Sequence, residues 1–113
     1  MKTKIIRIDK PWGYEELLEH NSHYVVKRLF MKKGCKCSYQ YHKHKLETAY
    51  SIKGALTIVF ENKEIILRPG DVITIKPFVK HRMFARKEDC LYLESSTPQL
   101  EDVVRVEDDY GRK

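Results

Sequence analysis

The chain has 113 residues, of which 42% are hydrophobic and 34% charged, and its formal net charge is +6 at pH 7. This length suits one domain with a modest core, and the longest apolar run, residues 55–60, is far too short to span a membrane. Basic residues are interleaved with acidic ones and no nucleic-acid recognition motif is found, so neither nucleic acid nor a membrane is an expected partner. The basic excess suits a small anionic ligand, and we expect a cytoplasmic protein.

The N-terminal third of the chain consists of strand-like runs separated by turns. Residues 5–8 and 15–19 are predicted to be short strands, and residues 24–31, rich in β-branched and aromatic side chains, a longer one. Alternation along 24–31 places Lys27 on one face and Arg28 on the other. Whichever face is buried, one basic side chain is buried with it, so we expect that residue to meet an acid, a ligand or the open end of the fold.

Residues 35–44 are predicted to form a long strand that carries the most informative side chains. Because side chains alternate along a strand, Gln40, His42 and His44 are predicted to share one face. Imidazoles at this spacing can reach one metal ion, and Glu47 could add a carboxylate across a tight turn. Taken alone, the two histidines fit a solvated strand equally well. Lys43 and Lys45 are expected to be solvated.

The remainder of the chain continues the same pattern of short strands. Turn residues such as Gly54 and Pro69-Gly70-Asp71 separate the predicted strands 48–52, 55–60, 64–67, 72–75, 81–85 and 90–95. About ten short strands and no helical apolar period predict an all-β fold, a small antiparallel jelly-roll barrel. We expect a single domain over 1–113, with a core at about 10–97 and a polar tail at 98–113.

Two motifs strengthen this interpretation. The spacing His42-x-His44-x-x-Glu47, followed after six residues by Gly54, resembles the first cupin motif. Gly70-Asp71, four residues and then residues 76–81, ending in His81, resembles the second. The resemblance implies a cupin barrel, or double-stranded β-helix, in which His42, His44, Glu47 and His81 bind one divalent metal ion. Lys76 stands where cupins usually have proline, and Phe78 where they usually have glycine.

The resemblance is closer to one branch of the cupins. Residues 11–15, 26–28, 40–47 and 101–112 look like the C-terminal cupin domain of type II mannose-6-phosphate isomerases. In that family the pocket would take a sugar phosphate beside the metal. Three imidazoles and a carboxylate suit Zn, Mn, Fe, Co or Ni, so the ligand types do not select among these metals.

The expected function is therefore a metal-dependent, mannose-6-phosphate isomerase-like aldose–ketose isomerisation, in which the metal polarises the sugar oxygens. Two alternatives remain: a non-catalytic cupin that binds a sugar or sugar nucleotide in glycan biosynthesis, and a small iron-dependent dioxygenase. Glu94 is a weak candidate for the catalytic base. The candidate substrate-binding residues are Gln40, Lys27, Arg28, Lys76 and Arg82.

A homodimer is expected as well, because cupins tend to dimerise through an outer sheet face or by strand exchange. Residues 4–8, together with Trp12 and Tyr14 as exposed aromatic side chains, are predicted to supply that surface.

Overall fold

A computed structural model describes residues 1–112, which form eleven β-strands and no α-helix, so none of these residues lies in a helix able to cross a membrane. The strands are β1 (Ile6–Lys10), β2 (Gly13–His20), β3 (Val25–Met31), β4 (Tyr39–Tyr41), β5 (Glu47–Lys53), β6 (Leu56–Phe60), β7 (Glu64–Leu67), β8 (Val72–Ile75), β9 (His81–Phe84), β10 (Cys90–Ser96) and β11 (Val104–Glu107). The first ten correspond to predicted strands. The eleventh lies in the segment expected to be a tail.

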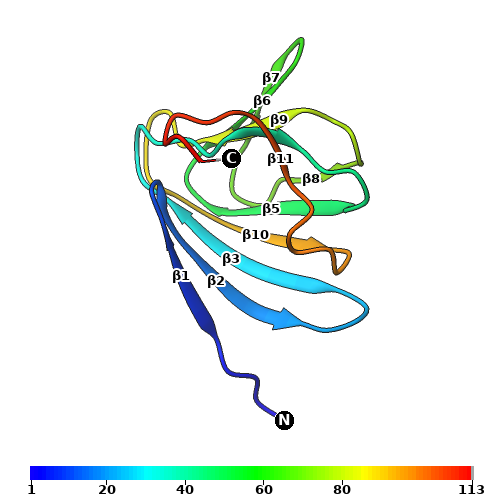
Figure 1. The fold of residues 1–113 in the computed structure, drawn as a ribbon. Helices are drawn as coiled ribbons and strands as arrows, with labels where there is room; N and C mark the ends of the chain where they lie inside the picture. The colour runs from blue at the N-terminus through cyan, green and yellow to red at the C-terminus, as the bar shows by residue number, and fades with distance from the viewer. Residues whose placement is uncertain (113) are drawn as a thin grey trace.

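The strands form two antiparallel sheets that face each other (Figure 1). One sheet has the order β1-β2-β3-β10-β5-β8 and the other the order β11-β4-β9-β6-β7. In Figure 1 the N-terminal strands lie at the lower side, and β1 forms an edge from which the N-terminus extends away. This arrangement confirms the predicted all-β, antiparallel jelly-roll barrel.

The register of the six-stranded sheet carries polar side chains into the barrel. Glu94 on β10 lies opposite Lys27 on β3 and also opposite Ala49 on β5. Residues directly opposite each other in an antiparallel pair project from the same face, so these three residues form one row. Ala49 is fully buried, which identifies this row as facing the interior.

The apolar core fills the layers next to this polar row. Met31 lies opposite Cys90 and Leu29 opposite Tyr92, and all four side chains are buried. Trp12 joins the same core and is only 4% exposed. The prediction that Trp12 is an exposed aromatic at a dimer surface is therefore wrong, because its indole packs inside the barrel.

Two turns hold the strands in this register. Asp71 closes the turn before β8, where its carboxylate accepts a hydrogen bond from the Arg68 backbone N–H at 2.9 Å. Gly54 connects β5 to β6 with φ of +83°, and a Cβ there would lie 2.2 Å from the carbonyl oxygen of Asp89. Only glycine combines this backbone conformation with such a close approach.

The long strand predicted over residues 35–44 is shorter in the structure. Only Tyr39–Tyr41 form a strand, and Lys36 makes an isolated bridge to Phe84. Beyond Tyr41 the chain bends, so the alternation on which the prediction relied ends at that point. The bend changes which side chains enter the barrel.

Candidate metal centre

Three potential metal ligands meet inside the barrel. His42 follows β4, Glu47 begins β5 and His81 begins β9, and their ligand atoms all lie within 4.8 Å of one another. Glu47 Oε1 lies 2.7 Å from Nε2 of His42 and 3.7 Å from Nε2 of His81. All three residues are buried, each with no more than 2% of its surface exposed.

Hydrogen bonds on the far side of each imidazole orient the two histidines. Nδ1 of His42 donates to the carbonyl oxygen of Asp102 at 2.5 Å, and Nδ1 of His81 donates to that of Val79 at 2.8 Å. A carbonyl oxygen can only accept, so Nδ1 carries the proton in both rings. Each Nε2 lone pair is therefore available at the centre, which is the arrangement that metal-binding histidines usually show.

The charge state of the cluster also fits a cation. Burial lowers the pKa of His81 and favours its neutral form, although the nearby Glu47 charge opposes this. Burial alone would raise the pKa of Glu47, but His42, Lys45 and His81 outweigh it and hold that pKa below its ordinary value. Neutral imidazoles and an ionised carboxylate are the forms that bind a metal.

The central atoms lack ordinary partners. His42 Nε2 and Glu47 Oε1 are buried and make no hydrogen bond within the described residues, despite the 2.7 Å between them. Buried polar atoms without partners are costly, and a bound cation would satisfy both. The donor set of two imidazole nitrogens and one carboxylate oxygen therefore fits a divalent transition metal.

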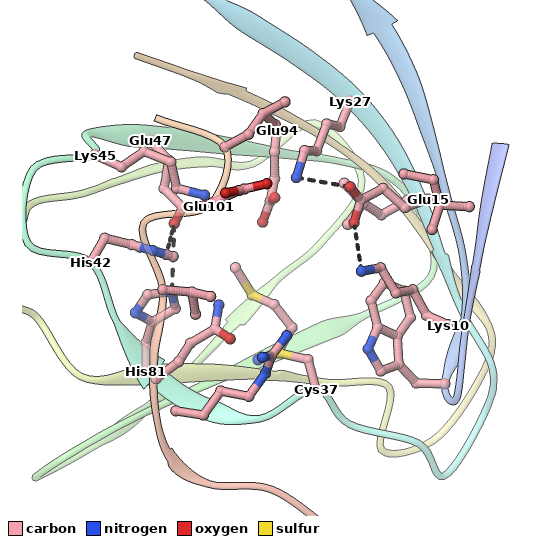
Figure 2. Close-up of a pocket in the computed structure, with 18 of the residues that line it drawn as sticks. Lys10, Glu15, Lys27, Cys37, His42, Lys45, Glu47, His81, Glu94 and Glu101 are labelled. Atoms are coloured by element: carbon pink, nitrogen blue, oxygen red, sulfur yellow. Dashed lines mark hydrogen bonds and ion pairs between the residues drawn. The ribbon is translucent and has the colours of Figure 1, made fainter. Parts of the chain in front are cut away.

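A second charged group lies across the cavity from this cluster (Figure 2). Lys27 Nζ lies 2.9 Å from Glu15 Oε1, and Lys10 Nζ lies 3.8 Å from Glu15 Oε2. Burial alone would lower the pKa of Lys27, but the charges of Glu15 and Glu94 raise it above the ordinary value, so Lys27 stays protonated. A cavity of about 390 Å³ separates the two groups.

Glu94 lies between the metal cluster and Lys27 (Figure 2). Its side chain lies inside the barrel, and the part of its surface that is exposed faces the cavity. Burial, reinforced by the negative charge of Glu47, raises the pKa of Glu94 well above its ordinary value. A carboxyl in this position can hold a proton at neutral pH.

The structure brings together part of the predicted metal set. His42, Glu47 and His81 converge, whereas His44 is exposed and lies outside the cluster. The bend after Tyr41 explains this, because it turns His44 outward and the next residue inward. Lys45, predicted to be solvated, is only 7% exposed and lines the cavity.

The predicted substrate-binding residues also separate into two groups. Gln40 and Lys27 line the cavity. Arg28 projects from the outer face, where its Nε donates to Glu16 at 2.7 Å, and Lys76 is exposed away from the cavity. Arg82 is buried, but on the side opposite His81, where its Nε donates to the Cys37 carbonyl oxygen. These three residues are not placed to touch a ligand in the cavity.

Sequence reasoning missed the C-terminal contribution to this cavity. The segment expected to be a polar tail crosses the cavity mouth and contributes lining residues, namely Leu100, Glu101, Val103, Arg105 and Arg112. The available signal was the short apolar pair Val103-Val104, whose second residue begins β11.

The barrel and its histidine–carboxylate centre define a cupin, and comparison with known structures agrees. KdgF from Halomonas sp. superposes with a TM-score of 0.77 at 19% identity, covering 86% of this chain and 91% of that one. A cupin-superfamily sugar phosphate isomerase from Silicibacter pomeroyi superposes with a TM-score of 0.63 at 22% identity, covering 74% and 59%. At these identities the likeness establishes the fold.

Residues 2–108 match the family described as mannose-6-phosphate isomerase C-terminal, and the chain belongs to that family. A mannose-1-phosphate guanylyltransferase from Salmonella montevideo is 29% identical over 107 residues, which are 91% of this chain and 23% of that protein. The chain spans about a quarter of the length of the curated relatives it matches.

Proposed function

We propose that this cupin is a metal-dependent isomerase that interconverts the aldose and ketose forms of a phosphorylated sugar. The observation that carries the proposal is the position of a carboxyl group, Glu94, between the His42–Glu47–His81 cluster and the cationic Lys27. The family to which the chain belongs supports the same class of substrate.

Each end of the cavity has a part in this reaction. A metal ion held by His42, Glu47 and His81 would polarise the sugar oxygens and stabilise negative charge developing on them. Lys27, fixed by Glu15, provides a positive charge for the anionic substrate at the other end. A cation at the cluster would favour the ionised form of Glu94, which can then take a proton from one sugar carbon as general base and return it to the other carbon as general acid.

The test is metal analysis of the purified chain coupled to an isomerase assay. We expect mannose 6-phosphate to be converted to fructose 6-phosphate, and His81→Ala to lose both the metal and the activity. Glu94→Gln should retain the metal but lower turnover by about 10²–10⁴-fold, the usual contribution of general acid–base catalysis. Arg28→Gln is the matched control, because this residue projects from the outer face and should leave turnover unchanged.

Failure to turn over any hexose phosphate with a full complement of metal would contradict the proposal. If such a protein still bound sugar phosphates stoichiometrically, a non-catalytic binding role would replace it.

One observation favours a second candidate function. Without His44 the cluster has two histidines and one carboxylate, a ligand set also used by non-haem iron oxygenases. Oxygen consumption by the Fe(II)-loaded chain, lost in His42→Ala, would support dioxygenase chemistry instead of isomerisation.

A further inference from the structure

One residue of the C-terminal segment contacts the backbone of the metal-ligand loop at several points. The Asp102 carboxylate accepts hydrogen bonds from three consecutive backbone N–H groups, those of Lys43, His44 and Lys45, at 3.0, 2.6 and 2.9 Å. The backbone carbonyl of the same residue accepts the Nδ1 proton of His42. Asp102 thus contacts both the loop and the first candidate ligand.

These contacts determine which side chains face the metal centre. Three N–H groups that point at one carboxylate hold residues 43–45 in a bend that a regular strand cannot adopt. The bend directs His44 outward while His42 and Glu47 remain inside. The carbonyl bond then fixes the ring of His42 with Nε2 toward the centre.

The C-terminal segment is itself anchored on both sides of Asp102. Before it, Thr97 and Leu46 exchange hydrogen bonds, since the Thr97 N–H donates to the Leu46 carbonyl and Thr97 Oγ1 accepts from the Leu46 N–H. After it, β11 pairs with β4, with Val104 opposite Tyr41. Asp102 is therefore held at a defined place beside the loop.

A second anchor lies further along the segment. Asp109 forms ion pairs with Arg82 at 3.6 Å and with Lys36 at 3.4 Å. Arg82 is thus used to attach the C-terminal segment to β9. Its burial follows from this structural role.

We propose that Asp102 is a positioning residue of the metal centre, so that the affinity of this domain for a divalent metal depends on its C-terminal segment. The inference rests on the proposed metal site and is independent of the reaction that the site catalyses. Residues that orient metal ligands typically contribute 10–100-fold to metal affinity.

The test measures Co(II) binding to the full chain by competition with a chromophoric chelator. We expect Asp102→Ala to weaken binding by about 10–100-fold and Asp102→Asn, which keeps one acceptor oxygen, to weaken it less. Glu107→Gln is the matched control: it removes an equal charge from the same segment at a side chain that is 69% exposed, and Asp109 still pairs with Arg82 when the 3.9 Å ion pair of Glu107 with Arg82 is lost. This control should bind Co(II) as the wild type does.

Spectroscopy separates positioning from general stability. The visible absorption of bound Co(II) reports its ligand geometry, and we expect a changed spectrum in Asp102→Ala even at saturating metal. Unchanged affinity and spectrum in a folded Asp102→Ala protein would overturn the inference. If that variant fails to fold, the same two measurements on Asp102→Asn decide the question.

The wild-type titration distinguishes this inference from the proposed function. If the wild type does not bind Co(II), the metal centre itself is refuted. If it binds Co(II) and the Asp102 variants bind it equally well, only the role of Asp102 is refuted.

Discussion

Phe78 adopts a backbone conformation that residues other than glycine rarely adopt. Its φ is +67°, and it is the only non-glycine residue among residues 1–112 with a positive φ. Its N–H donates to the carbonyl of His42 at 2.6 Å, and its exposed ring stacks on Tyr41 with centroids 6.0 Å apart. The left-handed region costs an L-residue about 1–2 kcal/mol, and that cost is borne beside a candidate metal ligand.

At Phe78, replacement by glycine should give a more stable protein than replacement by alanine, which is the reverse of the usual order. Both Phe78→Ala and Phe78→Gly lose the ring, but only the glycine variant relieves the backbone strain. We expect Phe78→Gly to be more stable than Phe78→Ala by about 1 kcal/mol in urea denaturation. At the neighbouring Val79, whose φ is not positive, glycine should be the less stable of the two. If the alanine variant were the more stable one at both positions, the backbone of Phe78 would not be strained.

The directions of individual side chains show where the two-residue alternation of a β-strand stops being a reliable guide. Alternation correctly separates Lys27 from Arg28, because both lie within a regular strand, but only the pairing of Lys27 with Glu94 in the folded sheet shows that Lys27 is the one facing inward. It fails for His44 and Lys45, because a carboxylate more than fifty residues away bends their loop. No local feature of residues 40–47 contains that information.

At the scale of elements, β11 is the least conspicuous strand and one of the most consequential. It has four residues, and its pairing with β4 includes an irregularity between Arg105 and Glu107. Its short, charged sequence has no apolar run comparable with that of β6. The ten other strands were predictable because each shows hydrophobic alternation and is flanked by turn residues. The strand β11, by contrast, depends on pairing with a strand some sixty residues earlier.

Because of the contact between the C-terminal segment and the metal-ligand loop, the free energy of unfolding should depend on pH in the acidic range. Burial alone would raise the pKa of Asp102, but the N–H groups of His44, Lys43 and Lys45 outweigh it and lower that pKa to about 2, from 3.8. Because the folded-state pKa is depressed, the stabilisation is fully present above the unfolded pKa and disappears as the pH falls through the folded one.

The measurement compares the wild type with Asp102→Asn in metal-free buffer. We expect the wild type to be more stable by about 1–2 kcal/mol at pH 6, with the difference shrinking from about pH 4 towards pH 2. Urea midpoints at several pH values give this difference directly. A difference that stays constant down to pH 2 would mean that the carboxylate charge has no part in the contact.

At the scale of the whole molecule, the homodimer stays a prediction, and its surface is narrower than the sequence suggested. Trp12 is buried and Tyr14 is half-buried, with its ring stacked on Phe30. This leaves the isoleucines of the N-terminal edge: Ile5, Ile6 and Ile8 are 47%, 53% and 40% exposed. An exposed apolar edge strand is a ready surface for pairing with a second copy.

Sedimentation tests this prediction. We expect a species of twice the 13.5 kDa chain mass, shifted towards the monomer by Ile6→Lys, which places a charge on the edge strand without entering the core. Ile66→Lys, at an exposed position on β7 in the other sheet, is a suitable control. A wild-type mass of 13.5 kDa at all concentrations would contradict the dimer.

The hydrogen bonds of Asp102 also bear on the order in which the molecule folds. The loop at residues 43–45 and its carboxylate partner are separated by almost sixty positions, so the contact closes late and carries a large loop-closure entropy. During synthesis the hairpins of the barrel can pair before residue 102 has left the ribosome, but the metal-ligand loop cannot take its final shape until then. A nascent chain would therefore bind a metal more weakly until its C-terminal segment has joined the barrel.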